Sequence, residues 1–200
     1  MARLGILGGT FNPPHIAHLV CAQEALVALK LDAIAFVPAG SPPHKRIESD
    51  PGIEHRMALC DRAVAGDDRL RVSRIDVDRP GPSYTVDTLR ALHEREPEHD
   101  LTFIVGGDMA LTFPGWREPE TVLELAELGV AEREGVRRSD IVERLSGLRG
   151  AAARVHFFDM PRIDVSSSLL RRRVANGRPL RYLVPDAVAG YVDDEGLYQR

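Results

Sequence analysis

Two histidines follow a glycine- and proline-rich segment near the N-terminus, and residues of these types at this spacing can bind phosphate. The segment reads Gly8-Gly9-Thr10-Phe11-Asn12-Pro13-Pro14-His15-Ile16-Ala17-His18. Glycine lacks a Cβ, so the backbone can approach a bulky anion closely. Paired prolines suit the entry to a helix, which we expect to begin at about His15. The N–H groups and positive end of that helix would face the anion, with His15 and His18 on one face of its first turn.

Other interpretations of this segment stay open. The histidines could be half of a metal site, although no Glu or Cys completes a local ligand set. They could also be solvated residues at a helix cap. The flanking glycines and prolines favour phosphate contact over both. The segment is neither a Walker loop, since Gly-Lys-Ser/Thr occurs nowhere in the chain, nor a Gly-x-Gly-x-x-Gly fingerprint.

A second candidate anion site lies near the C-terminus, where three hydroxyl side chains precede an arginine. Ser166, Ser167 and Ser168 are typical of a capped helix start. Arg171 follows three and four residues later, so its guanidinium shares a helix face with the hydroxyls. Hydroxyls, helix N–H groups and a guanidinium fork together bind oxyanions. Taken alone, such a pattern is most often a solvated helix start, and the first motif is what favours function.

The chain between and around these motifs alternates short apolar runs with helical periodicity. Strands are expected at residues 4–7, 33–37, 70–75, 101–105, 128–131 and 155–158. Helices are expected at residues 15–30, 54–64, 85–96, 118–127, 139–145, 167–175 and 185–192. This alternation predicts an α/β, Rossmann-like, doubly wound parallel sheet with helices on both faces, as one domain over residues 1–200.

Two glycine-rich strand ends are expected to meet in this sheet. Open sheets bind ligands beyond the carboxyl ends of their strands, where strand order reverses, usually between the first and fourth strands. The first predicted strand ends in Gly8-Gly9-Thr10, and the fourth ends in Gly106-Gly107-Asp108. The fold therefore predicts a ligand site between them.

Composition narrows the classes of partner. The 200 residues are 44% hydrophobic and 28% charged, as in ordinary globular proteins, and a net charge of -4 gives no general attraction to nucleic acid or anionic membranes. No apolar run approaches the ~18 residues of a membrane span. The N-terminus reaches glycines before a signal peptide could form, and two cysteines make no disulfide framework. We expect a cytoplasmic protein without nucleic-acid or membrane partners.

The N-terminal segment resembles the Gly-Gly-Thr-Phe-Asp-Pro-x-His-x-Gly-His signature of the HxGH nucleotidyltransferases, most closely the bacterial nicotinate-nucleotide adenylyltransferases. Two positions depart from it: Asn12 replaces Asp, and Ala17 replaces the Gly between the histidines and could narrow the approach of a phosphate. The segment Val165-Ser166-Ser167-Ser168-Leu169-Leu170-Arg171 resembles the family's Ile-Ser-Ser-Thr-x-x-Arg. Ser168 keeps the hydroxyl of the usual threonine.

Internal stretches extend the resemblance over nearly the whole chain. They are residues 37–45, 54–57, 82–89 and 103–108, followed by Trp116. In the family, the first stretch lies over the phosphates, the Ser-Tyr-Thr segment and the tryptophan hold the nicotinate nucleotide, and Gly-x-Asp holds the adenosine ribose. Each stretch alone also fits a simpler structural role: a surface turn at 42–45, helix packing at 54–57, a helix cap at 83–85 and core packing for Trp116.

The resemblance implies three sets of site residues and no protein metal ligand. The catalytic set is His15, His18, Lys45 and Arg171. The ATP-binding set is Gly8, Gly9, Thr10, Phe11, His15, His18, Gly106, Asp108, Ser166, Ser167, Ser168 and Arg171. The mononucleotide-binding set is His44, Lys45, Tyr84, Thr85 and Trp116.

The implied reaction transfers the AMP moiety of ATP to nicotinate mononucleotide, giving nicotinate adenine dinucleotide and pyrophosphate in NAD biosynthesis. The attacking phosphate has a second pKa of about 6, so no general base is required. Mg²⁺ is expected as a cofactor bound mainly by the triphosphate. ATP and nicotinate mononucleotide are the expected partners, with a homo-oligomer left open.

Two rival functions stay open at this point. Another HxGH transferase, such as a pantetheine-phosphate adenylyltransferase or a cytidylyltransferase, is disfavoured by Ser83-Tyr84-Thr85 and Trp116. A nucleotide-binding sensor without turnover is disfavoured by the charged groups retained in both phosphate motifs. Release of pyrophosphate would separate a transferase from a sensor.

Overall fold

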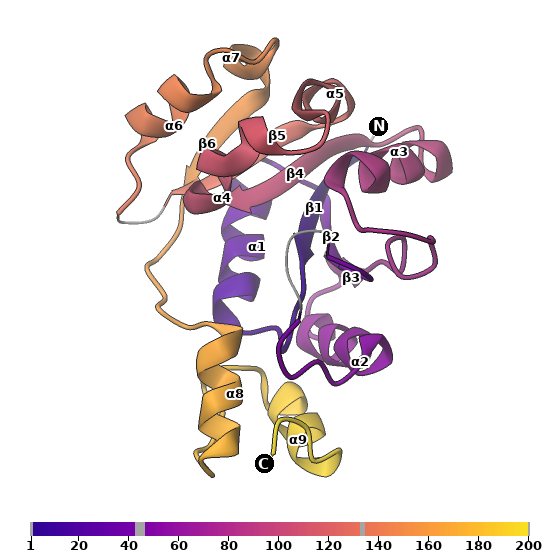
Figure 1. Cartoon of the computed structure of the whole chain (residues 1–200), viewed down its shortest axis with the longest axis vertical. Coiled ribbons are helices and arrows are strands. Elements are labelled where there is room, and N and C mark those ends of the chain that lie inside the picture. The colour runs from indigo at the N-terminus through magenta and orange to yellow at the C-terminus, as the bar shows by residue number, and fades with distance from the viewer. Residues whose placement is uncertain (1, 43–46, 133–134, 200) are drawn as a thin grey trace.

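The computed structural model describes residues 2–42, 47–132 and 135–199. In this part of the chain a six-stranded, all-parallel sheet has the order β3-β2-β1-β4-β5-β6 (Figure 1). The strands are β1 Arg3–Gly9, β2 Ala33–Pro38, β3 Leu70–Val72, β4 Asp100–Gly106, β5 Glu127–Glu132 and β6 Val155–Asp159. The predicted strands are all present.

The strand order reverses between β1 and β4, as the sequence predicted. Strands β2 and β3 extend the sheet on one side of β1, and β4, β5 and β6 extend it on the other. Gly9 at the end of β1 is in register with Pro38 of β2, and Leu7 is in register with Ile104 of β4. The glycine-rich ends of β1 and β4 therefore lie side by side at the carboxyl ends of the central strands. Open α/β sheets bind ligands at this position.

Helices cover both faces of the sheet, which confirms the doubly wound fold within a single domain (Figure 1). The helices are α1 Ile16–Ala28, α2 Ile53–Val64, α3 Thr85–Arg95, α4 Gly107–Thr112, α5 Pro119–Leu125, α6 Arg138–Leu145, α7 Ala151–Arg154, α8 Ser167–Ala175 and α9 Asp186–Asp194, with a 3₁₀ turn η1 at Phe113–Gly115. Two short helices, α4 and α7, and the turn η1 were not predicted, because none is long enough to show an apolar period.

One predicted strand is too long. Strand β3 ends at Val72 rather than at residue 75, because the N–H groups of Val77 and Asp78 bond to the carbonyl of Arg74 and fold the following residues into a turn. The same turn brings Asp76 toward the site described below.

Alternating side chains of the strands supply two separate cores. On one face, Ile6, Phe103 and Val130 pack against α3, α4, α5 and α6. On the other face, Phe36 and Ile104 pack against α1 and α2. A period of two residues places successive side chains on opposite faces, so strands buried on both sides are almost wholly apolar.

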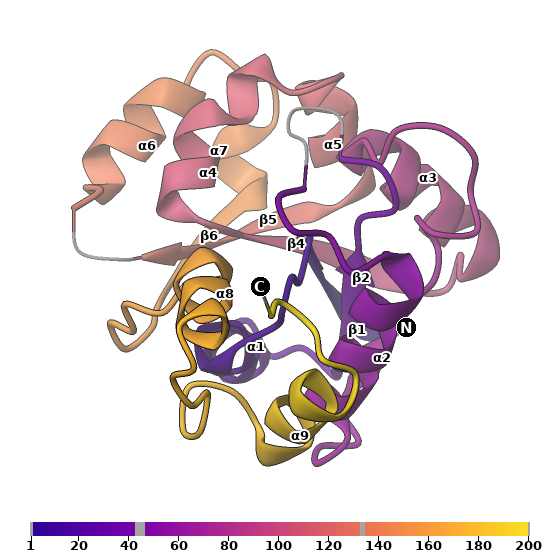
Figure 2. The ribbon, with the colours of Figure 1, turned by 60° about the horizontal axis from the view of Figure 1, so that its bottom comes forward.

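The C-terminal helices form a third apolar cluster at one end of the molecule. Leu170 of α8 and Val188 and Val192 of α9 pack with Leu59 of α2. Helices α8 and α9 lie beside α1 and α2, away from the α6 end of the sheet (Figures 1 and 2). This packing fixes α8, the helix of the second candidate anion site, against α2 and α9.

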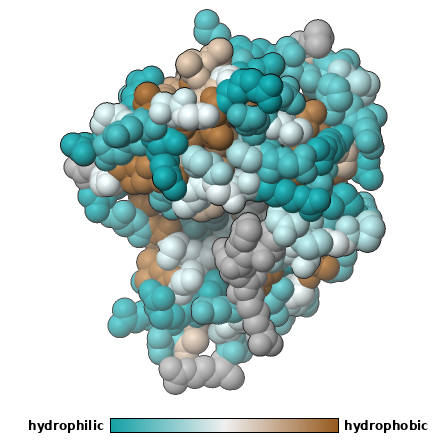
Figure 3. Space-filling model, turned by 45° about the horizontal axis from the view of Figure 1, so that its top comes forward, coloured by the Kyte–Doolittle hydropathy of each residue, from teal (hydrophilic) through white to brown (hydrophobic). Residues whose placement is uncertain are grey.

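The outer surface is mostly hydrophilic on the face drawn in Figure 3, with smaller hydrophobic patches between charged residues. Across the described ranges, no helix is long and apolar enough to cross a membrane.

Candidate active site

A cavity of about 410 Å³ opens where β1 and β4 end. These members of the predicted site line it: Gly8, Gly9, Thr10, His18, Tyr84, Thr85, Gly106, Asp108 and Trp116. Phe11, His15, Ser166, Ser167, Ser168 and Arg171 are not among the lining residues. His44 and Lys45 lie outside the described residues. The topology thus brings together residues that are more than a hundred positions apart in the sequence.

The histidine pair stands at the start of α1. His15 is the N-cap residue in an extended conformation, so the helix begins at Ile16 and only His18 lies within its first turn. The two rings stack with centroids 3.8 Å apart. The backbone N–H of His15 donates to Nδ1 of His18 at 3.1 Å. Because Nδ1 accepts, the neutral imidazole of His18 carries its proton on Nε2, which makes Nε2 a hydrogen-bond donor.

The side chain of Phe11 lies beneath His18 rather than in the lining. It is buried, with its ring centroid 5.1 Å from that of His18 and 5.3 Å from that of Phe36. Phe11 also has a positive φ of 48°, and a Cβ on Gly9 would lie only 3.1 Å from its ring. The second glycine therefore gives room for this ring as well as for a ligand.

Polar side chains of helix α8 contact the segment before the histidines, at Asn12 and Pro13. The Arg171 guanidinium donates to the carbonyl oxygen of Asn12 at 2.9 Å and to Oγ of Ser168 at 3.2 Å. The Ser167 hydroxyl donates to the carbonyl of Pro13 at 2.8 Å, and Ser166 Oγ accepts from a backbone N–H as the N-cap. These groups support the loop before the histidines, a structural role that the sequence interpretation did not include.

Asn12, the first departure from the family signature, is buried, and both the nitrogen and the oxygen of its side-chain amide make hydrogen bonds. Its Nδ2 donates to the carbonyl of Glu48 at 2.9 Å, and its Oδ1 accepts from the Tyr198 hydroxyl at 2.7 Å. The carbonyl of Glu48 can only accept a hydrogen bond, so its contact with residue 12 requires the NH₂ group of asparagine. Burial raises the pKa of Tyr198 well above its usual range, which keeps the phenol a donor.

Arg56 is a second support of the strand ends. Its side chain is 1% exposed and donates to the carbonyls of Thr10 and Ala39 at 3.0 and 2.8 Å, and to Asp50 at 3.1 Å. It therefore ties the segment after β1 to the one after β2. This arrangement supports the helix-packing interpretation of residues 54–57.

Aromatic and hydroxyl side chains form the other end of the cavity. Tyr84 is the N-cap of α3 and Thr85 is its first residue. The Trp116 ring packs on Phe103 and Phe113, with centroids 6.0 and 5.1 Å away, and also lines the cavity. Trp116 is thus both a packing residue and a wall of the site.

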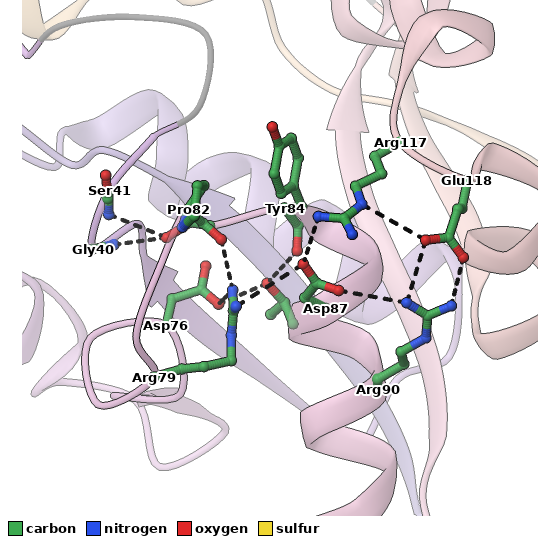
Figure 4. Close-up of polar contacts among 12 residues, drawn as sticks. Gly40, Ser41, Asp76, Arg79, Pro82, Tyr84, Asp87, Arg90, Arg117 and Glu118 are labelled. Carbon is green, nitrogen blue, oxygen red and sulfur yellow. Dashed lines mark hydrogen bonds and ion pairs between the residues drawn. The ribbon is translucent and has the colours of Figure 1, made fainter.

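Ser83 and Asp76 hold the Tyr84 segment in place through hydrogen bonds. Figure 4 shows Asp76 beside Arg79 in this network. Ser83 Oγ accepts from the backbone N–H groups of Gly40 and Ser41 at 3.0 and 3.2 Å. Asp76 accepts from the Thr88 hydroxyl at 2.7 Å. Burial raises the pKa of Asp76, and the hydrogen bond from Thr88 acts against that shift.

Several lining residues were missed by sequence reasoning, namely Asp76, Thr88, Met109 and Arg117. Only Arg117 had a usable signal, its position next to Trp116. Asp108 is exposed at the N-terminus of α4, where a carboxylate can accept the hydrogens of a diol. Over the described ranges, no group of three or more His, Cys, Asp or Glu could hold a metal ion.

Comparisons with known proteins agree with this geometry. A family model described as cytidylyltransferase-like matches residues 6–173. A protein of Thermomicrobium roseum, named as a probable nicotinate-nucleotide adenylyltransferase, is 42% identical over 100% of this chain and 92% of its own. A Roseiflexus protein of the same name is 43% identical over 99% of this chain and 98% of its own. The fold matches Plasmodium falciparum nicotinic acid mononucleotide adenylyltransferase complexed with NaAD, with a TM-score of 0.79 at 16% identity, over 99% of this chain and 98% of that one.

Proposed function

Because this chain belongs to the nicotinate-nucleotide adenylyltransferase family, we propose that it transfers the AMP moiety of ATP to nicotinate mononucleotide and releases pyrophosphate. The observation that carries the proposal is the cavity at the ends of β1 and β4, in which His18 and Asp108 lie together with Tyr84 and Trp116. Donors for phosphate and an aromatic wall for a pyridine ring are what the two substrates require.

The reaction is an in-line displacement at the α-phosphorus of ATP. An oxygen of the mononucleotide's 5′-phosphate forms the new bond, and the bond from the α-phosphorus to the bridging oxygen breaks, so that its electron pair leaves on pyrophosphate. The attacking phosphate, with a pKa of about 6, is already largely ionised at neutral pH. Catalysis then rests on positioning two polyanions and stabilising charge on the α-phosphate oxygens.

We assign the donor role to His18. Its Nε2–H is fixed by the bond that Nδ1 accepts from the His15 backbone, so the ring is held in the tautomer that can donate to an α-phosphate oxygen. His15 orients His18 by ring stacking and by this bond. For Arg171, the contact with the Asn12 carbonyl supports a role in shaping the loop before the histidines. Its assignment to the ATP polyphosphate rests on the family resemblance.

The remaining roles follow the two ends of the cavity. We assign Asp108 to the adenosine ribose, and Tyr84, Thr85 and Trp116 to the nicotinate nucleotide, as the family resemblance implies. His44 and Lys45 are assigned to the phosphates on the same ground.

A divalent metal ion is general to this family of nucleotidyltransferases. We propose Mg²⁺, entering as part of the ATP substrate and bound mainly by triphosphate oxygens, since Mg²⁺ commonly uses substrate phosphates rather than a protein cage. The net charge of -4 favours a protein that acts without nucleic acid. We propose a cytoplasmic location because Cys21 and Cys60 are both free thiols.

The direct test is an assay of pyrophosphate release with ATP, Mg²⁺ and a panel of acceptors, with the products identified by mass. Nicotinate mononucleotide should give the dinucleotide and one pyrophosphate per turnover. Reaction of pantetheine phosphate without reaction of either pyridine mononucleotide would move the chain to another branch of the superfamily. Nucleotide binding without release from any acceptor would favour the sensor interpretation.

A further inference from the structure

The C-terminal segment of the chain returns to the loop that precedes the histidines. Helix α9 ends at Asp194, and the N–H of Leu197 bonds to the carbonyl of Val192 at 2.9 Å, which turns the chain back on the helix. Leu197 then packs into the third apolar cluster. Figure 2 shows the yellow C-terminal segment passing between α8 and α2 toward the link between β1 and α1. On that link, Oδ1 of Asn12 accepts a hydrogen bond from the Tyr198 hydroxyl at 2.7 Å.

Asn12 is the point at which three distant parts of the chain meet. It is 1% exposed, and its Nδ2 donates to the carbonyl of Glu48, which lies before α2, at 2.9 Å. Its backbone carbonyl accepts from Arg171 of α8 at 2.9 Å, and Tyr198 supplies the third bond. A buried amide that loses one of its partners pays the cost of desolvation without compensation. The three bonds together therefore fix both the position and the orientation of this residue.

Two residues at this junction have backbone conformations that residues other than glycine rarely adopt. Phe11, directly before Asn12, has a φ of 48°, and Tyr198 has a φ of 64°. Such conformations persist only where surrounding contacts hold them, and they cluster at functional sites. The buried ring of Phe11 meets the ring of His18 edge-on, with centroids 5.1 Å apart. A shift of Asn12 would therefore move Phe11 and, with it, the support of His18.

We propose that Tyr198 is a positioning residue for the transfer reaction, an inference that rests on the proposed function. Tyr198 is not among the described residues that line the cavity, so it acts on His18 through Asn12 and Phe11. A donor stabilises the transition state only where its hydrogen meets an α-phosphate oxygen, and a misplacement of about 1 Å can cost on the order of 100-fold in rate. Binding of the two substrates depends on many other contacts, so the effect of Tyr198 lies in kcat.

The test measures steady-state kinetics of the full chain with ATP and nicotinate mononucleotide. Tyr198→Phe removes the hydroxyl and keeps the ring, and it should lower kcat about 10-fold while KM for either substrate changes less than about threefold. Val188→Ala is the matched control for lost stability, because Val188 is fully buried in the same apolar cluster. It should lower the melting temperature by a similar amount and keep the wild-type kcat.

A second background separates positioning from loss of folded protein. If Tyr198 acts through His18, adding Tyr198→Phe to His18→Ala should change kcat less than about twofold, because the donor that is positioned is already absent. Partial unfolding would instead lower kcat by the same factor in both backgrounds.

Three results would overturn the role of Tyr198 in an active wild type: equal factors in the two backgrounds, an unchanged kcat in Tyr198→Phe, or an equal loss of kcat in Val188→Ala. A wild type that forms no dinucleotide from either pyridine mononucleotide would overturn the proposed function itself, and the role of Tyr198 with it.

Discussion

We propose that His18 acts through the ring nitrogen that carries its proton. The bond from the His15 N–H to Nδ1 of His18 leaves the proton of the neutral ring on Nε2. The family signature pointed to the pair of histidines, but spacing alone treats the two alike. The structure separates them, since His15 caps the helix and is buried whereas His18 lines the cavity.

Replacing His18 should remove one donor to the α-phosphate. We expect His18→Ala to lower kcat by about 10²–10³-fold, which is the usual cost of losing one oxyanion donor. The melting temperature should change little, and His93→Ala, at an exposed position on α3, is the control. Steady-state kinetics with near wild-type kcat for His18→Ala would return this histidine to a structural role.

Tyr198 should stabilise the segment before the histidines through its hydrogen bond to Asn12. Its hydroxyl donates at 2.7 Å to Oδ1 of the buried asparagine, and its raised pKa keeps the proton in place across the working pH range. Tyr198→Phe leaves that oxygen unsatisfied and should lower the free energy of unfolding by about 1–3 kcal/mol. Tyr182→Phe, at a side chain that is 77% exposed, should have no measurable effect in the same denaturant titration. Equal stability of both variants would contradict the assigned contact.

At the scale of elements, helix α8 supports the loop before the histidines. Arg171 and Ser167, one helical turn apart on α8, donate to the carbonyls of Asn12 and Pro13. The sequence predicted the bounds of this helix correctly, because a serine cap and an Asn-Gly end mark them. What the sequence did not indicate is that these polar groups bond to the loop of the first motif, 154 and 159 positions away.

Arg171 should be irreplaceable by lysine, because a lysine cannot reproduce two bonds from one planar fork. We expect Arg171→Lys to lower kcat/KM for ATP by on the order of 10-fold, as for loss of a positioning contact worth about 1.4 kcal/mol. Arg172→Ala, on the exposed side of the same helix, should leave it unchanged. Equal effects in initial-rate measurements would indicate a diffuse basic surface instead of a specific contact.

Strands were easier to predict than the short elements beside them. Runs such as 33–37 are apolar throughout because both faces of the strand are buried, and this signal is local. The end of β3 and helix α4 depend on turn bonds and on packing against α6. Arg117 was missed although it follows Trp116 in the sequence, because its place in the cavity depends on the fold of the link between η1 and α5.

At the scale of the whole molecule, the third apolar cluster holds α8, which carries the second motif, against α2 and α9. Leu170 is fully buried between α8, α9 and α2, next to Arg171 in the sequence. Leu170→Ala should lower the free energy of unfolding by about 2–5 kcal/mol, as for other buried leucines. Val142→Ala, at a side chain that is 53% exposed, is the control in thermal unfolding. If Leu170→Ala lowered the free energy of unfolding by less than Val142→Ala does, the third apolar cluster would add little to the stability of the fold.

The central claim is that the mononucleotide's phosphate attacks the α-phosphorus of ATP. The most direct measurement uses nicotinate mononucleotide with ¹⁸O in the non-bridging oxygens of its phosphate, followed by mass analysis of both products. The attacking oxygen becomes the new bridge, so the dinucleotide should carry all of the label and pyrophosphate none. Label in the pyrophosphate, or no dinucleotide at all, would contradict the account.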